Sequence, residues 1–192
     1  MKTNLLVMVM AMAVALTGCS KSNSEPTALN LAKLGNAYVG EHAKDKVVQI
    51  RSDKSVGSLT PNVWYVVYYD QTAPLKAVEV KFGAGQMMGV ERPLRLLEPL
   101  FGNDQPLLAD KIKIDSNEAI ELALKEPILK NLKVTSTAPK LERGEDGLPV
   151  WKVRVWAAKL RNPTEEADLG EIILSAEDGK LRLAKVEISR VD

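Results

Sequence analysis

The pattern of apolar and polar residues divides the 192-residue chain into an apolar start, a short polar segment and a long region of alternating stretches. Residues 5–16 form an unbroken apolar run, which follows Lys2 and ends just before Thr17. This run is too short to cross a bilayer as a helix, which takes about 20 apolar residues. A positive start, a short apolar run and small residues at its end are typical of a secretory signal peptide.

The end of this leader, Leu16-Thr17-Gly18-Cys19, resembles the lipobox of bacterial lipoproteins. The resemblance implies that residues 1–18 are removed as a signal peptide and that palmitate-type acyl chains anchor the protein through Cys19. An ordinary cleaved signal beside a chance cysteine is the alternative. Ser20 favours, in that family, the periplasmic face of the outer membrane, although the residue after it can alter the sorting. Residues 19–26 are polar and are expected to form a flexible tether.

Residues 27–92 are expected to form a first module that begins with a helix. Apolar or ring-bearing residues recur there at spacings of three and four, the period of one helix face: Leu31, Leu34, Tyr38 and His42. β-Branched and aromatic residues then gather in three predicted strands, and a glycine turn leads into a fourth stretch: residues 47–50, 62–70, 75–82 and 86–91.

Residues 93–110 are expected to link two modules. They carry Pro93, Pro99 and Pro106, and prolines at this density break a long helix. Several leucines and a phenylalanine lie between the prolines, which argues against a loose linker. We therefore expect a short helical turn or loop packed between the modules.

Residues 111–192 are expected to form a second module with clearer signals. Asp115, with Glu118 three residues later, is typical of a helix N-cap, and an apolar stripe follows. Pro127 ends or kinks this helix. Four antiparallel strands are predicted after it, the last two joined by an Asp-Gly turn: residues 132–141, 148–157, 171–176 and 181–188. The predicted fold class is α+β, with the helix on one face of the sheet.

The two modules look like an internal repeat. Trp64 aligns with Trp151 at an offset of 87, and the valines around them align as well. Further on, Val78 aligns with Ile172 and Val80 with Leu174, at an offset of 94. Because identity is low, chance similarity between strands is the alternative to a duplication.

The second module resembles the PepSY domain in three places: residues 115–123, 148–153 and 175–181. The turn at residues 177–179 lacks the threonine usual in that family. The resemblance implies two tandem PepSY-like modules, each a helix packed on a small antiparallel sheet, in the cell envelope. Such modules occur in propeptides of thermolysin-type proteases, where an inhibitory role has been proposed.

Composition narrows the classes of function. Without the leader, the chain has 25 basic and 25 acidic residues. It therefore has no net positive charge that would attract nucleic acid. Cys19 is the only cysteine and His42 the only histidine, so we expect no disulfide, no zinc site and no cofactor. Paired carboxylates occur at residues 145–146, 165–166 and 177–178, in turns where solvated charge is the simplest interpretation.

The stretch at residues 62–70 is apolar on both predicted faces, whereas its counterpart carries Lys152 and Arg154 on one. A strand buried on both sides is one interpretation. The other is an exposed aromatic patch for a protein or peptide partner, formed by Tyr65, Tyr69 and Trp156.

These observations predict a lipid-anchored, non-enzymatic binding module of the cell envelope that acts through protein–protein contacts. Restraint of an envelope protease is one candidate role. A structural or assembly lipoprotein of the outer membrane is the alternative, and a carboxylate-dependent enzyme is less favoured because no arrangement of catalytic groups stands out.

Overall fold

The computed structural model describes residues 26–92 and 105–192. The predicted leader, Cys19 and most of the linker therefore lie outside the described residues. Within the described ranges, no helix has the length and apolar character needed to span a bilayer.

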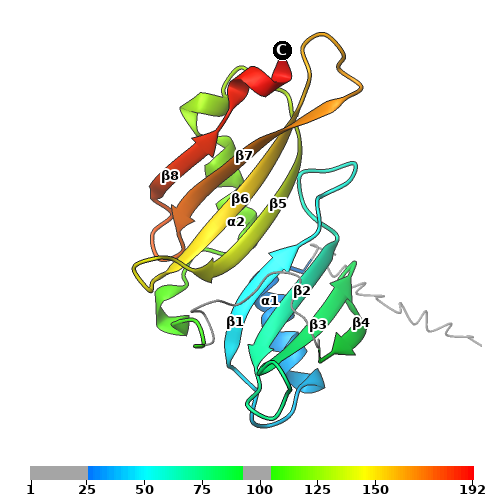
Figure 1. Cartoon of the computed structure of the whole chain (residues 1–192), viewed down its shortest axis with the longest axis vertical. Coiled ribbons are helices and arrows are strands. Elements are labelled where there is room, and N and C mark those ends of the chain that lie inside the picture. Colours follow the sequence, from blue (N-terminus) through cyan, green and yellow to red (C-terminus); the bar gives the residue numbers. More distant parts are fainter. Residues whose placement is uncertain (1–25, 93–104) are drawn as a thin grey trace, which may run out of the picture.

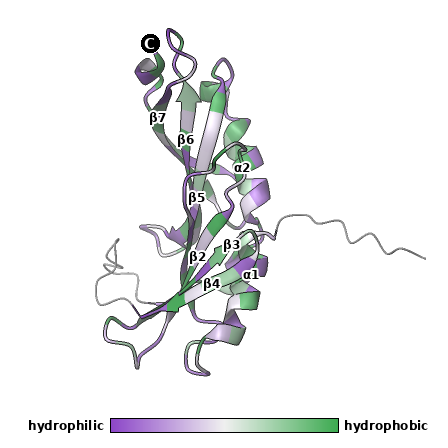
Figure 2. Cartoon of the chain, turned by 90° about the vertical axis from the view of Figure 1, so that its right-hand side faces the viewer, coloured by the Kyte–Doolittle hydropathy of each residue, from purple (hydrophilic) through white to green (hydrophobic). Residues whose placement is uncertain are grey.

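The described chain forms one antiparallel sheet of eight strands with two helices on the same face (Figures 1 and 2). Each half contributes a helix followed by four strands. The first half contains α1 (Ala28–Gly35), β1 (Val47–Ser52), β2 (Val63–Tyr69), β3 (Ala77–Gly83) and β4 (Gln86–Glu91). The second contains α2 (Ser116–Leu124), β5 (Val134–Arg143), β6 (Pro149–Ala158), β7 (Glu166–Ser175) and β8 (Leu181–Val186). Short 3₁₀ turns occupy Asn36–Tyr38, Ala109–Lys111, Pro127–Leu129 and Ile188–Val191.

The predicted α+β class and the helix-then-four-strands order are confirmed, but the prediction of two separate small modules is wrong. The strand order β4-β3-β2-β1-β5-β6-β7-β8 joins the halves where β1 pairs with β5. Ser52 Oγ donates to Pro139 O over 3.3 Å, and Ser55 N donates to Thr137 O over 2.8 Å. The halves therefore share one hydrogen-bonded sheet.

Strand pairing shows how the halves correspond. Tyr65 lies opposite Arg51, and Lys152 lies opposite Lys140, so Arg51 and Lys140 occupy equivalent positions. These two residues also face each other across the β1–β5 seam, which places a pseudo-twofold axis between them. Such a relationship supports the predicted repeat.

One part of the predicted alignment shifts by two residues. Trp64 lies opposite Phe82 on β3, and Trp151 lies opposite Leu174 on β7, so Phe82 corresponds to Leu174 at an offset of 92 instead of 94. β7 also begins earlier than predicted and bulges at Gly170. A Cβ there would approach Lys185 O to 2.1 Å, and φ is +108°. The shift preserves the inward face because strand side chains alternate with a period of two.

The first helix is shorter than its apolar spacing predicts. It ends at Gly35, where a Cβ would come within 2.1 Å of the buried Tyr68 hydroxyl, which itself donates to Ala32 O. Tyr38 then lies in the 3₁₀ turn and His42 in an exposed turn. The close approach of helix and strand thus stops a periodicity that continues in the sequence.

The N-termini of the two helices meet beneath the seam. Asp115 Oδ1 accepts hydrogen bonds from Ser116 N at 2.6 Å, in its own helix, and from Leu29 N at 3.2 Å, in α1. Ser116 Oγ accepts from Ala28 N at 3.0 Å and is fully buried. One carboxylate therefore offsets the positive ends of both helix dipoles.

We expect Asp115→Ala to lower the free energy of unfolding by about 2 kcal/mol, the upper end for loss of one cap, because two helix ends lose an acceptor. Urea denaturation followed by circular dichroism would measure it. Asp110→Ala is a matched control on an exposed carboxylate near the same helix. Equal stability of the two variants would contradict the shared cap.

Candidate functional site: the open face of the sheet

Among the described residues, no helix or strand covers one face of the sheet, and we call it the open face (Figure 2). In-register positions on neighbouring strands form a row of four cations and one tyrosine across its middle, which we call the basic row: Lys81, Tyr65, Arg51, Lys140 and Lys152. The row runs from β3 to β6 and crosses the seam. Because pairing alone brings these residues together, both halves contribute to one surface.

The next row along the strands contains two glutamates, Glu79 and Glu142, which hold the cations in place. Arg51 Nη2 lies 2.9 Å from Glu79 Oε2. The Glu142 carboxylate lies 3.3 Å from Lys140 Nζ and 2.5 Å from Lys152 Nζ. Burial raises the pKa of Glu142, but the hydrogen bonds and charges of the two lysines outweigh it and leave the pKa below its usual value. Glu142 therefore stays ionised, which does not suit a general acid.

Tyr65 lies within the basic row between two cations. The Arg51 guanidinium lies 4.3 Å and the Lys81 ammonium 5.2 Å from the ring centroid, and the hydroxyl donates to Asp53 over 3.1 Å. Arg51 Nη1 is buried and has no hydrogen-bond partner among residues 26–92 and 105–192. A half-exposed aromatic ring held by cations is a rigid, amphipathic contact surface.

Trp156 repeats this arrangement in the second half. Lys54 lies 5.0 Å and Arg154 5.7 Å from the Trp156 ring centroid. Lys54 also pairs with Glu166, and Arg154 with Asp168 at 2.5 Å. The side chain is half-buried, like that of Tyr65.

The three predicted partner-binding aromatics all point to the open face, but they do not form one cluster. Tyr69 packs with Val48, Val67 and Ala77 in a small second core, so β2 is partly buried on both sides. Tyr69 and Trp156 lie on opposite sides of the basic row because β2 and β6 run in opposite directions. The three positions therefore span the face, with Tyr65 in the middle.

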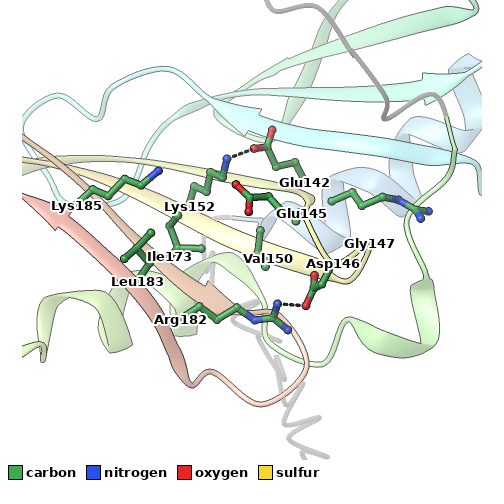
Figure 3. Close-up of a pocket in the computed structure, with 12 residues that line it drawn as sticks. Glu142, Glu145, Asp146, Gly147, Val150, Lys152, Ile173, Arg182, Leu183 and Lys185 are labelled. Atoms are coloured by element: carbon green, nitrogen blue, oxygen red, sulfur yellow. Dashed lines mark hydrogen bonds and ion pairs between the residues drawn. The ribbon is translucent and has the colours of Figure 1, made fainter.

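A pocket of about 780 Å³ opens on this face in the second half (Figure 3). The β5–β6 turn forms one wall and the paired strands β7 and β8 form the other. Its lining carries charges of both signs around a small apolar floor: Glu142, Arg143, Gly144, Glu145, Asp146, Gly147, Val150, Lys152, Ile173, Arg182, Leu183 and Lys185. Glu142 and Lys152 belong to both the pocket and the rows described above.

Some charged side chains of the pocket are held in ion pairs, and others have no ion-pair partner among the described residues. Asp146 pairs with Arg182, and the hydrogen bonds from Arg182 and from the Leu148 amide lower the pKa of this carboxyl. Figure 3 shows Glu145 and Lys185 beside these pairs, and neither has an ion-pair partner within the described ranges. The pocket can therefore pair with a ligand that carries both a positive and a negative group.

Sequence reasoning missed the β8 side of this pocket. Arg182 lies beside a register shift between Ile173 and Leu174, and Leu183 and Lys185 lie opposite Ile173 and Glu171. Only the pairing of β8 with β7 brings them to the turn. The nearest signal in the sequence is the carboxylate pair at residues 145–146, for which solvated charge is the simplest interpretation.

Metal ligation finds no support in the described part of the chain, where no group of three or more His, Cys, Asp or Glu side chains is placed to hold an ion. His42 is exposed in a turn of the first half.

No family model, curated protein or solved structure matches this chain. The resemblance to PepSY domains and to bacterial lipoproteins therefore stays a prediction.

Proposed function

We propose that this chain is a lipid-anchored binding protein of the bacterial cell envelope that holds a protein or peptide segment on its open face. The observation that carries the proposal is the surface shared by both halves, where the basic row connects Tyr65 to the mixed-charge pocket through Lys152. Tyrosine, tryptophan and arginine are enriched at interfaces that recognise protein, and the open face presents Tyr65, Trp156 and Arg51.

The charge balance favours a peptide over a polyanion. Most cations of the open face are already paired with carboxylates, as Arg51 is with Glu79 and Lys152 with Glu142. A nucleic acid would need a surplus of positive charge to release counterions. A peptide segment instead offers backbone groups and side chains of both signs, which suit the uncommitted Glu145 and Lys185.

The start of the described chain supports attachment through the first half. Pro26 lies against the β3–β4 turn, where a Cβ on Gly85 would meet it at 2.5 Å. Six residues lie between Cys19 and Pro26, and the seven steps from one Cα to the next reach at most about 25 Å. An anchor at Cys19 would therefore hold the β3–β4 end near the membrane, while the pocket lies in the other half of the sheet.

Photo-crosslinking in intact cells tests the proposal. A photo-reactive amino acid in place of Tyr65 or Trp156 is expected to give a defined adduct, identified by mass spectrometry. Leu34, 52% exposed on α1, provides a control on the helix-covered side. Equal adducts from all three positions, or none from the open face under any growth condition, would overturn the proposal.

The identity of the crosslinked partner would then distinguish between the two candidate roles. A protease that forms a stable complex with the purified protein and is slowed by it would establish restraint. A membrane protein that co-purifies with the chain, together with an envelope defect on deletion, would establish an assembly role.

A further inference from the structure

The edge strand β4 carries exposed apolar side chains on both sides of the sheet. Met87 lies opposite Phe82, which is buried on the helix side. Gly83 alternates with Phe82 and so faces the open side, where a Cβ on it would run into Met88 Sδ. Met87, Met88 and Val90 are 39%, 62% and 38% exposed. The apolar surface therefore wraps around the edge of the sheet instead of lying on one face.

Tyr38 extends this apolar surface on the helix side. It is exposed in the 3₁₀ turn after α1, and its ring meets that of Phe82 edge-on, with 6.4 Å between the centroids. Because Phe82 pairs with Met87, the tyrosine lies at the same edge of the sheet. Tyrosine suits a boundary between water and lipid, since its ring is apolar and its hydroxyl is polar. We call Tyr38, Met87, Met88 and Val90 the edge patch.

The backbone of β4 is poorly suited to pairing with a further strand. Lys81 pairs with Gly89 and Phe82 with Met87, which leaves Met88 as an extra residue in a bulge. A bulge twists an edge strand and opposes strand addition. The head-group region of a bilayer needs no strand register, and water there still reaches backbone groups that would be costly to bury in hydrocarbon. A lipid surface therefore fits this edge better than another strand does.

The start of the described chain lies beside the edge patch. Pro26 packs against the β3–β4 turn, where a Cβ on Gly85 would meet it at 2.5 Å, and β4 begins at the next residue, Gln86. The seven Cα steps from Cys19 to Pro26 reach at most about 25 Å. A chain anchored at Cys19 cannot carry the edge patch far from the bilayer. The tether thus turns a weak apolar contact into an intramolecular one.

We propose that the edge patch rests in the head-group region of the membrane, so that the sheet stands on its β4 edge. This inference rests on the proposed anchor at Cys19. Both sides of the sheet stay accessible in this orientation, so the open face is free to hold its partner. The opposite edge, β8, is seven strand spacings away, up to about 34 Å from β4. The two edges therefore lie at different distances from the bilayer.

Quenching of fluorescence by lipid tests the proposal. The chain from Cys19 onward is coupled through that thiol, the only one present, to a maleimide lipid. The vesicles contain phosphatidylethanolamine, phosphatidylglycerol and a lipid with a spin-labelled head group as quencher. A fluorescent amino acid replaces Gln86 on β4 or Leu181 on β8, both exposed. Quenching is expected to be several-fold stronger at position 86, and equal quenching at the two positions would overturn the proposal.

Two double variants separate contact from tethering. Met87→Ser with Met88→Ser is expected to lose most of the quenching at position 86, because the apolar contact is removed while the tether stays. Leu181→Ser with Leu183→Ser, at exposed positions on β8, is the matched control and is expected to keep it. Thermal denaturation checks that both variants are folded.

Unchanged quenching in the methionine variant would show that the tether alone brings β4 near the lipid, and the proposal would be wrong. An equal loss in the β8 variant would contradict it as well. Because the coupling is chemical, neither result depends on acylation in cells or on the open-face partner. Failure of this inference can therefore be told apart from failure of the proposed function.

Discussion

Replacing Cys19 with Ser is expected to move the protein almost entirely from the membrane fraction to the soluble fraction of the cell envelope. In the proposed anchor the acyl chains are attached through a thioether at Cys19, which a serine hydroxyl cannot form, and each buried CH₂ would contribute about 0.8 kcal/mol to attachment. Loss of two or three chains therefore changes partitioning by many orders of magnitude. Fractionation, with a palmitate analogue as metabolic label, would measure both attachment and acylation.

The matched control for this variant is Ser20→Ala, which leaves the thiol in place and should stay in the membrane fraction. A carbonate wash separates lipid attachment from retention by a protein partner, because the wash removes peripherally bound protein. If the Cys19→Ser variant resisted the wash quantitatively, the lipid-anchor prediction would be wrong. The open-face proposal would survive that result, since it rests on a different part of the chain.

The elements of the fold were largely readable from the sequence, because the physics that sets them is local. Alternation around Trp64 and Trp151 gave both central strands, and Asp115 gave the start of the second helix. Both tryptophans are buried, each with its indole N–H donating to a backbone carbonyl. A period of two and a capping side chain need no knowledge of distant residues.

The join between the halves could not be read in this way. Arg51 and Lys140 face each other across the seam, and two cations opposite one another would by themselves disfavour pairing. Glu79 and Glu142 offset that repulsion. Glu79 on β3 reaches Arg51 on β1 because the folded sheet brings these strands close, and Glu142 pairs with Lys140 two residues earlier on β5. The prediction of separate modules rested on the internal repeat and on the prolines of residues 93–110, and neither feature indicates that β1 pairs with β5.

The candidate site, like the fold, could be predicted from the sequence only in part. The face to which Tyr65, Tyr69 and Trp156 point followed from alternation along single strands, which the sequence displays. Their separation depended on strand order and direction, and the pocket depended on the register shift beside Arg182. Sequence thus predicted which side chains reach the surface better than which of them meet there.

Trp151→Ala is expected to lower the free energy of unfolding by about 3–5 kcal/mol, the usual cost of truncating a large buried side chain. The residue is fully buried, and its indole nitrogen donates to Ile114 O over 2.9 Å, so the carbonyl also loses its partner. For a domain whose total stability is about 5–15 kcal/mol, such a loss brings it close to unfolding. Denaturant titration would measure the change. Trp156→Ala, on the opposite face of the same strand and half-buried, is the matched control and should cost far less.

The Trp151→Ala variant also tests whether the two halves of the sheet unfold together. Because β1 pairs with β5 and Thr137 is bonded to both Ser55 and Leu59, weakening the second half should also loosen the first. Hydrogen exchange is therefore expected to speed up in β2 and β3 as well as in β6 and β7. Wild-type protection of β2 and β3 in the Trp151→Ala variant would show that the halves unfold independently, as separate modules do, despite the sheet that joins them.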